Sequence, residues 1–188
     1  MRIIPILVAA SVALTPLSAQ QATLTAAAST RATAVLTLNA PRVQGQPAPA
    51  ALTVRIDYGQ PHVRGRAVPT ELATDGTVWR TGANGSTTLT SDVDLVIGGK
   101  DVPKGVYSIY SVREGGKYFL IINRNTGQWG TEYDGTKDLV RVPLTARTTV
   151  EVMESLQIAL VPPMDGPAKG ALTIAWGKLH LSTEWAVK

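Results

Sequence analysis

Apolar and polar residues alternate along much of this chain with a period of two. Val54, Ile56 and Tyr58, for example, alternate with Arg55 and Asp57. Such alternation is typical of a half-buried β-strand, whose successive side chains point to opposite faces. No stretch shows the helical period, so we expect little or no helix. The same alternation recurs in residues 93–97, 156–160, 172–176 and 179–187.

Glycine-containing pairs separate several of the predicted strands. Gly98-Gly99, Gly115-Gly116 and Gly177-Lys178 each stand between two strand-like runs. Glycine supplies the positive φ that tight hairpin turns require, so we predict three antiparallel hairpins. About ten short strands with this punctuation predict an all-β fold, namely an antiparallel, jelly-roll-like β-sandwich.

Three segments lack the alternation and are predicted to be loops: residues 40–50, 59–76 and 126–138. The first is rich in proline, whereas the other two hold aromatic and charged residues together. Long loops in a compact domain are usually either functional or disordered. We therefore expect the functional site in the second and third of these segments.

The first residues have the composition of a signal peptide. Met1-Arg2 supplies a basic start, residues 3–14 form an apolar run, and small residues follow. The apolar run is shorter than the ~20 residues that cross a bilayer. We therefore predict a cleaved signal peptide at residues 1–19, with an uncleaved membrane tether as the alternative. The mature protein would be exported to the periplasm or the medium, without stable membrane insertion after cleavage.

The rest of the chain is long enough for one domain with its own core. We expect a loose lead-in at residues 20–28 and a single domain at residues 29–188.

The chain has no cysteine, which excludes disulfides and thiolate metal sites. Its net charge of +4 is spread along the chain, so no nucleic-acid partner is expected. His62 and His180 lie far apart without a metal-binding spacing, and we expect no metal and no cofactor.

The first motif-rich segment, residues 58–66, contains His62, Arg64 and Arg66. Arginine forks bind carboxylates and phosphates through two parallel hydrogen bonds, so these arginines are candidates for holding an anionic group. The alternative is that this basic loop pairs with a nearby acidic residue, Asp57 or Asp75, which would add little stability.

The second motif-rich segment, residues 78–87, contains Trp79, Arg80 and Asn84. Because neighbouring residues of a strand point to opposite faces, one of Trp79 and Arg80 would enter the core while the other faces a cleft. Asn84 carries two donors and an acceptor and could orient a ligand. It could equally close a turn by hydrogen bonding to its own backbone.

The third motif-rich segment, residues 123–141, combines Trp129 and Tyr133 with several acidic residues. Such a combination would suit a sugar or peptide groove. Two carboxyl groups could also act as the acid/base pair of glycoside cleavage, which needs a set separation across the bond. The alternative is that they are solvated turn formers. The acidic residues in question are Glu132, Asp134 and Asp138.

Groups of motif residues follow one another along the chain: Tyr58–Arg66, Val78–Asn84, Val102–Ser108, and Gln128–Gly130 with Tyr133 and Lys137-Asp138. Together they resemble the domain-of-unknown-function family numbered 2911, over nearly all of the chain from about Ser29 onward. The resemblance implies continuity of fold with exported bacterial proteins. That family has no assigned activity, so the resemblance implies no mechanism and no catalytic residue. This chain departs from the family by having Gly85 where an acidic residue is common, and by a longer loop at residues 41–50.

The leading hypothesis is a non-catalytic exported binding module whose site lies where the three motif-rich segments meet. In it Arg66, Arg80 and Arg141 would hold a polar or anionic ligand, such as a sugar or peptide, and Asn84 would orient it. Aromatic side chains would provide a stacking wall. The candidate binding residues are His62, Arg66, Trp79, Arg80, Asn84, Trp129, Tyr133, Asp138 and Arg141.

Two other hypotheses belong to different classes. One is a hydrolase of sugars or peptides that uses Glu132 or Asp138 together with His62. The other is an envelope-structural or assembly domain, in which the arginines only tie loops together by ion pairs. Two carboxyl groups facing each other across a cleft would favour the hydrolase, and a fully paired arginine cluster would favour the structural role.

Overall fold

The structure is a computed structural model that describes residues 23–66, 74–164 and 166–188. The predicted signal peptide at residues 1–19 lies outside the described residues. The described part of the lead-in, residues 23–28, contains neither helix nor strand. In the described ranges we find no helix with the length and apolar character needed to span a bilayer.

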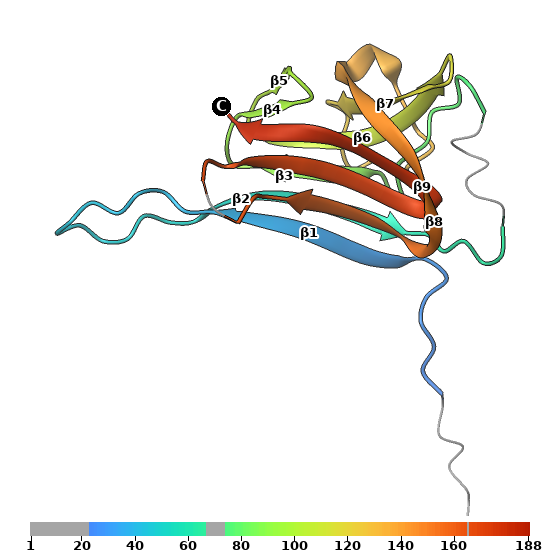
Figure 1. Cartoon of the computed structure of the whole chain (residues 1–188), viewed down its shortest axis with the longest axis horizontal. Helices are drawn as coiled ribbons and strands as arrows, with labels where there is room; N and C mark the ends of the chain where they lie inside the picture. Colours follow the sequence, from blue (N-terminus) through green and yellow to red (C-terminus); the bar gives the residue numbers. More distant parts are fainter. Residues whose placement is uncertain (1–22, 67–73, 165) are drawn as a thin grey trace, which may run out of the picture.

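Strands make up most of the described chain (Figure 1). The one helical element in the described ranges is a short 3₁₀ turn. The elements in chain order are β1 (Thr30–Leu38), β2 (Leu52–Gln60), β3 (Thr87–Ser91), β4 (Leu95–Ile97), β5 (Lys100–Val102), β6 (Gly105–Glu114), β7 (Lys117–Asn123), η1 (Gly135–Lys137), β8 (Asp138–Val161) and β9 (Lys169–Val187).

Hydrogen bonds join the strands into one 9-stranded sheet with the order β1-β2-β3-β6-β7-β8-β9-β4-β5. Every neighbouring pair is antiparallel, which confirms the predicted all-β antiparallel class. The strand order differs from a jelly roll, because Greek keys place strands from distant parts of the chain side by side. Here most sheet neighbours are also chain neighbours, and only the β4–β5 hairpin leaves the sequence order to pair with β9.

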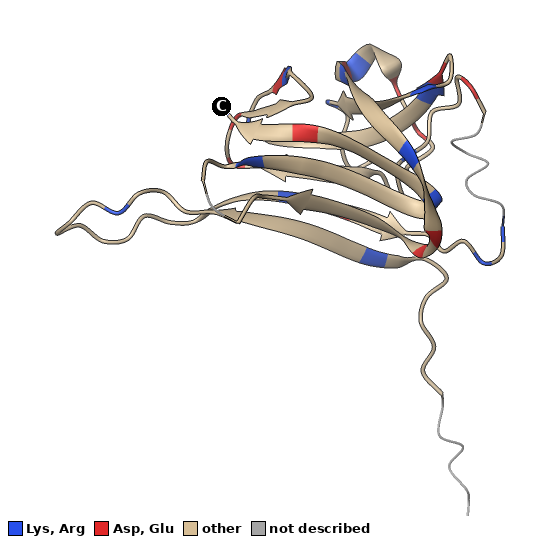
Figure 2. Ribbon diagram, in the orientation of Figure 1, with Lys and Arg blue, Asp and Glu red and all other residues tan. Residues whose placement is uncertain are grey.

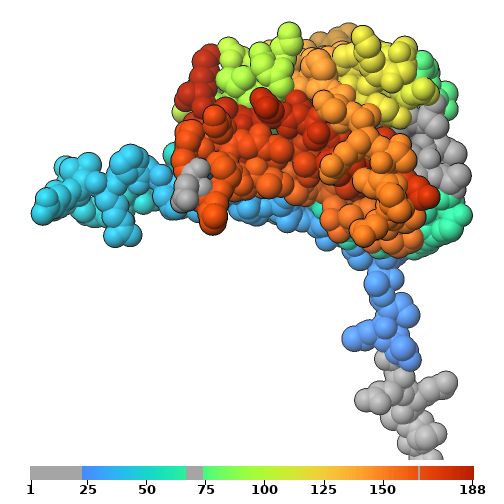
Figure 3. Space-filling view, viewed as in Figure 1, coloured from blue at the N-terminus to red at the C-terminus, as the bar shows by residue number. Residues whose placement is uncertain are grey.

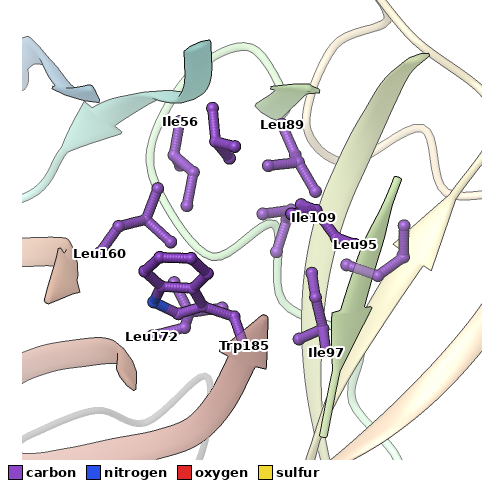
Figure 4. A pocket seen from close by; sticks show the side chains of 10 residues that line it. Ile56, Leu89, Leu95, Ile97, Ile109, Leu160, Leu172 and Trp185 are labelled. Carbon is purple, nitrogen blue, oxygen red and sulfur yellow. The ribbon is translucent and has the colours of Figure 1, made fainter. Parts of the chain in front are cut away.

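The sheet curves so that its apolar face encloses the core. Ile56 of β2, Leu89 of β3, Ile109 of β6 and Leu172 and Trp185 of β9 surround a void of about 10 Å³ (Figure 4). That volume is at most the size of one water molecule, and the lining is entirely apolar. This central void is therefore a packing feature of the core and not a ligand site.

Two of the three predicted hairpins are present. Gly98-Gly99 joins β4 to β5 and Gly115-Gly116 joins β6 to β7, and all four glycines have positive φ. The third prediction is wrong, because Gly177 lies inside the continuous strand β9. It has a φ of 60° and pairs with Met153 where the β8–β9 register shifts, so it forms a bulge rather than a turn.

The predicted loops lie at different places on the sheet. The proline-rich loop between β1 and β2, residues 39–51, is exposed throughout and projects away from the body as an arm (Figures 1 and 3). Pro61 and Arg66, which follow β2, line a cleft together with two other segments. Residues 77–80 and 82–84, which precede β3, come from one of them, and Gly130, Thr131 and Tyr133, which follow β7, come from the other. Three segments that are distant in sequence therefore meet in one place.

Candidate functional site

A cleft of about 380 Å³ opens between these three segments. We call it the arginine cleft, because Arg66 and Arg80 both line it. Three more of the predicted binding residues line it as well: Trp79, Asn84 and Tyr133. Its other lining residues are Ser29, Pro61, Thr77, Val78, Gly82, Ala83, Gly130, Thr131 and Trp176.

Two tryptophan rings form part of the cleft wall. Trp79 and Trp176 stack with their ring centroids 5.5 Å apart and their planes within 10° of each other. The guanidinium carbon of Arg66 lies 5.8 Å from the centroid of the Trp176 ring, a geometry that permits a cation–π contact. Both rings are almost fully buried, so they hold the wall rigidly. Trp176 was predicted only as a strand residue, because its alternation with neighbouring residues carries no sign of the cleft.

Neither cleft arginine has an acidic partner among the described residues. Arg66 donates from Nε to the Val63 carbonyl at 3.1 Å and from Nη2 to the His62 carbonyl at 2.8 Å. Arg80 donates from Nε to the Gly82 carbonyl at 3.4 Å. Backbone carbonyls therefore orient both guanidinium groups, and no acidic side chain in the described ranges matches their positive charges.

Two glycines make room for this arrangement. A Cβ at Gly130 would collide with Cδ of Arg80 and lie 2.7 Å from the Asn84 carbonyl oxygen. The Gly130 amide also donates to that same oxygen at 3.0 Å. A Cβ at Gly59 would collide with the carbonyl group of Ala83. These close backbone approaches fix the position of the segment that carries Arg80.

The described chain has three non-glycine residues with positive φ, and all of them lie in the segments that border the cleft. They are Arg64 at 51°, Thr81 at 50° and Asn84 at 64°. Thr81 is β-branched and buried, so this conformation is strained, at a cost of order 1–3 kcal/mol. Its hydroxyl pairs with the Ser111 hydroxyl at 2.7 Å, and its carbonyl accepts from the Thr87 hydroxyl at 2.9 Å. Backbone strain of this kind concentrates at functional sites.

Asn84 lies at a bend with a left-handed φ of 64°, a conformation that asparagine tolerates better than most residues. Its side chain does not close the turn through a hydrogen bond to a described backbone group, as one of the two predicted roles required. Its side chain lines the cleft and forms no hydrogen bond with the described residues. The amide group is therefore free to contact a ligand.

Basic and acidic residues are scattered over the described chain (Figure 2). One cluster of them borders the cleft, and its charged groups pair with one another. Arg141 donates from Nη1 to Glu114 at 2.7 Å and from Nε to Asp138 at 3.3 Å. The Tyr133 hydroxyl donates to the same Asp138 oxygen at 2.7 Å. We call these four residues the Arg141 network. Arg141 and Asp138 do not line the arginine cleft, and Tyr133 belongs to both regions.

The pKa of Tyr133 is raised to about 12. Burial is the larger cause, and the hydrogen bond to Asp138 is the second. Tyr133 therefore stays neutral and donates over the physiological pH range. Asp138 also accepts from the buried Asn123 amide at 2.8 Å, so its carboxylate has partners on several sides. This arrangement joins β6, β7 and β8.

The other two acidic residues of the third segment, Asp134 and Glu132, do not line the cleft. Asp134 caps η1 by accepting from the Thr136 amide at 2.9 Å. The side-chain hydrogen bond from Thr136 is the main cause that lowers the pKa of Asp134. Glu132 is exposed.

Two predicted binding residues lie beside the cleft rather than in its wall. His62 forms a bridge with Ser155 of β8, and its Nδ1 lies 2.7 Å from the Ser155 hydroxyl. Trp129 pairs with Gly85, and 53% of its surface is exposed. Within the described residues we find no group of three or more acidic or histidine side chains that could hold a metal ion.

Comparison with known families gives one match. A family model described as "Protein of unknown function (DUF2911)" matches residues 41–184 of the chain. No curated protein and no solved structure matches it. The matched range includes all three segments that form the arginine cleft, apart from Ser29 at its rim.

Proposed function

We propose that the chain, which belongs to the DUF2911 family of proteins of unknown function, is a non-catalytic exported module that binds a polar or anionic ligand. One observation carries the proposal: Arg66 and Arg80 line a single cleft, and neither has an acidic partner among the described residues. Like charges in one cleft repel each other, and a negative ligand would offset that repulsion.

The cleft offers a distinct role to each polar side chain. The guanidinium groups would hold the charged or most polar part of the ligand through charge-assisted hydrogen bonds. Asn84 and the Tyr133 hydroxyl would contact its neutral polar groups. The stacked pair of Trp79 and Trp176 provides a rigid apolar wall. Anionic sugars and peptides combine these features.

Arg141 was predicted to bind the same ligand, but its ion pairs with Glu114 and Asp138 support a structural role. The proposal therefore assigns binding to Arg66 and Arg80 and leaves Arg141 as a matched control. All three are arginines of the motif-rich segments, and they differ in whether their charge is already paired. Export rests on the signal-peptide pattern of residues 1–19.

The binding proposal can be tested by screening the purified protein against anionic sugars and peptides with a thermal-shift measurement. We expect compounds that raise the melting temperature of the parent and of Arg141→Ala but not of Arg80→Ala. Gly130→Ala should also lose the effect, because its Cβ would displace the Arg80 side chain.

The outcome that contradicts the proposal concerns stability without ligand. If Arg66→Ala and Arg80→Ala each lower the melting temperature more than Arg141→Ala does, the cleft arginines are scaffolding. A binding site that is empty should tolerate the loss of one of its unpaired charges.

A further inference from the structure

We infer that the ligand of the arginine cleft carries two negative charges on one compact group, as a phosphate monoester or a dicarboxylate does. This inference rests on the proposed binding function. The first support is charge balance. The lining residues that the structure describes include two guanidinium groups and no acidic side chain, so the formal charge of this described lining is +2. A monoanion would neutralise only one of the two arginines.

The second support is the set of donors that remain unused. A guanidinium has five N–H donors in a planar fork. In Arg80 only Nε donates to a described residue, so the edge formed by its two terminal nitrogens is open for a bidentate contact. In Arg66 the carbonyls of His62 and Val63 occupy Nη2 and Nε, and Nη1 remains open. An oxyanion with three or four oxygens can accept from both groups at once.

The third support is the size and the wall of the cleft. Its volume of about 380 Å³ lies near the lower end of the ~300–1,000 Å³ of small-molecule sites. The site therefore fits a small molecule or the end group of a longer one. The walls beside the arginines contain Trp79, Val78 and Trp176, so an apolar or planar body can lie next to the charged group. The indole N–H of Trp176 is buried and has no partner among the described residues.

The test uses four aromatic probes that share a ring and differ in charge. Phenyl phosphate and phthalate are dianions, benzoate is a monoanion, and benzyl alcohol is neutral. Titration calorimetry on the full mature protein at pH 7.5 should give a dissociation constant at least about tenfold lower for one of the dianions than for benzoate. A preference for phenyl phosphate indicates a phosphate group, and a preference for phthalate indicates a dicarboxylate. For a phosphate, affinity should fall between pH 7 and pH 5, because its second pKa is about 6.

Variants separate this inference from the binding proposal. Arg66→Ala and Arg80→Ala should each reduce the preference for the dianion over benzoate to less than about threefold, while Arg141→Ala should keep it. If benzoate binds the parent as tightly as both dianions and Arg80→Ala weakens all three, the dianion inference is overturned and anion binding stands. If none of the probes binds, the dianion inference is overturned. The binding proposal is then tested separately by the thermal-shift screen and by the stabilities of the arginine variants.

Discussion

The arginine cleft and the Arg141 network lie side by side and share Tyr133, yet their charges are arranged in opposite ways. Arg141 contacts two carboxylates, Glu114 and Asp138. Among the described residues, the two arginines of the cleft donate hydrogen bonds to backbone carbonyls and have no acidic partner. An arginine in a motif-rich segment is therefore not by itself a sign of a binding site. The presence or absence of an internal counter-charge separates the two roles.

The backbone differs between the two regions as well. The Arg141 network is attached to the regular strands β6 and β8, which hold Glu114, Asp138 and Arg141. The segments around the cleft contain left-handed residues and close backbone contacts such as Gly59 against Ala83. Side-chain pairing stabilises one region, whereas backbone packing maintains the other. Substitutions that disturb only the side-chain pairing or only the backbone packing should therefore affect the stability of one region and not of the other.

The largest effect is expected from Gly59→Ala, which acts on the backbone of the cleft. The new methyl group would collide with the Ala83 carbonyl, and backbone atoms cannot move aside as a flexible side chain can. We expect a loss of about 3 kcal/mol in the free energy of unfolding, measured by urea denaturation.

Gly85→Ala is the matched control for that substitution, because the nearest atom to its Cβ would be a terminal nitrogen of Arg31 at 3.8 Å. It should change stability by less than about 0.5 kcal/mol. Equal losses in the two variants would show that the contact between Gly59 and Ala83 does not hold the cleft segment in place.

An effect of alkaline pH is expected next, and it acts on the Arg141 network. The folded pKa of Tyr133 is raised to about 12 from an ordinary value of 10.0. A raised folded pKa means that the contribution to stability is complete below pH 10 and is lost as the pH rises through 12. Denaturation midpoints measured between pH 9 and pH 12 should fall over this window.

Asp138→Asn tests the cause of that alkaline effect. Removing the carboxylate should lower the pKa of Tyr133 while leaving it above 10.0, because burial is the larger cause. Absorbance titration of the tyrosinate form, with Tyr133→Phe to identify the signal, measures this change. A Tyr133 pKa that does not move in Asp138→Asn would contradict the role given to the hydrogen bond.

The smallest effects are expected from the arginines themselves. Arg141 is 42% exposed, so breaking its pairs in Arg141→Ala should cost only about 1 kcal/mol. Arg80→Ala should change the free energy of unfolding by less than about 0.5 kcal/mol or raise it, since the substitution leaves no described acidic side chain without its partner. Side-by-side urea denaturation of the two variants compares these values, and a larger loss in Arg80→Ala would reverse the assignment of the two regions.

Much of the fold could be predicted from the sequence. Val54, Ile56 and Tyr58 are buried, as their alternation predicts, and the glycine pairs between β4 and β5 and between β6 and β7 form hairpins. The turn predicted at Gly177 is the exception. A glycine with positive φ is compatible with a turn and with a bulge, so the sequence does not distinguish the two. In the structure Gly177 pairs with Met153 of β8 and forms a bulge. The strand order could not be predicted, because period-two alternation carries no information about which strand becomes the neighbour.

The meeting of the three motif-rich segments could be predicted from the sequence, but not which of their residues line the cleft. Arg66, Trp79, Arg80 and Asn84 do line one cleft, whereas Arg141 does not. Trp176 was missed as a cleft residue because it lies in a strand of ordinary alternation.

The strands, most of the turns and the presence of arginines in three motif-rich segments follow from the sequence alone, because they depend on residues that are neighbours in the chain. Which arginine has an acidic partner depends on the tertiary structure. Arg141 reaches Glu114 because β6 and β8 both pair with β7, which places the two residues on strands separated by only one strand. Ion pairing requires atoms within about 4 Å of each other, and that proximity is set by strand register rather than by distance along the chain.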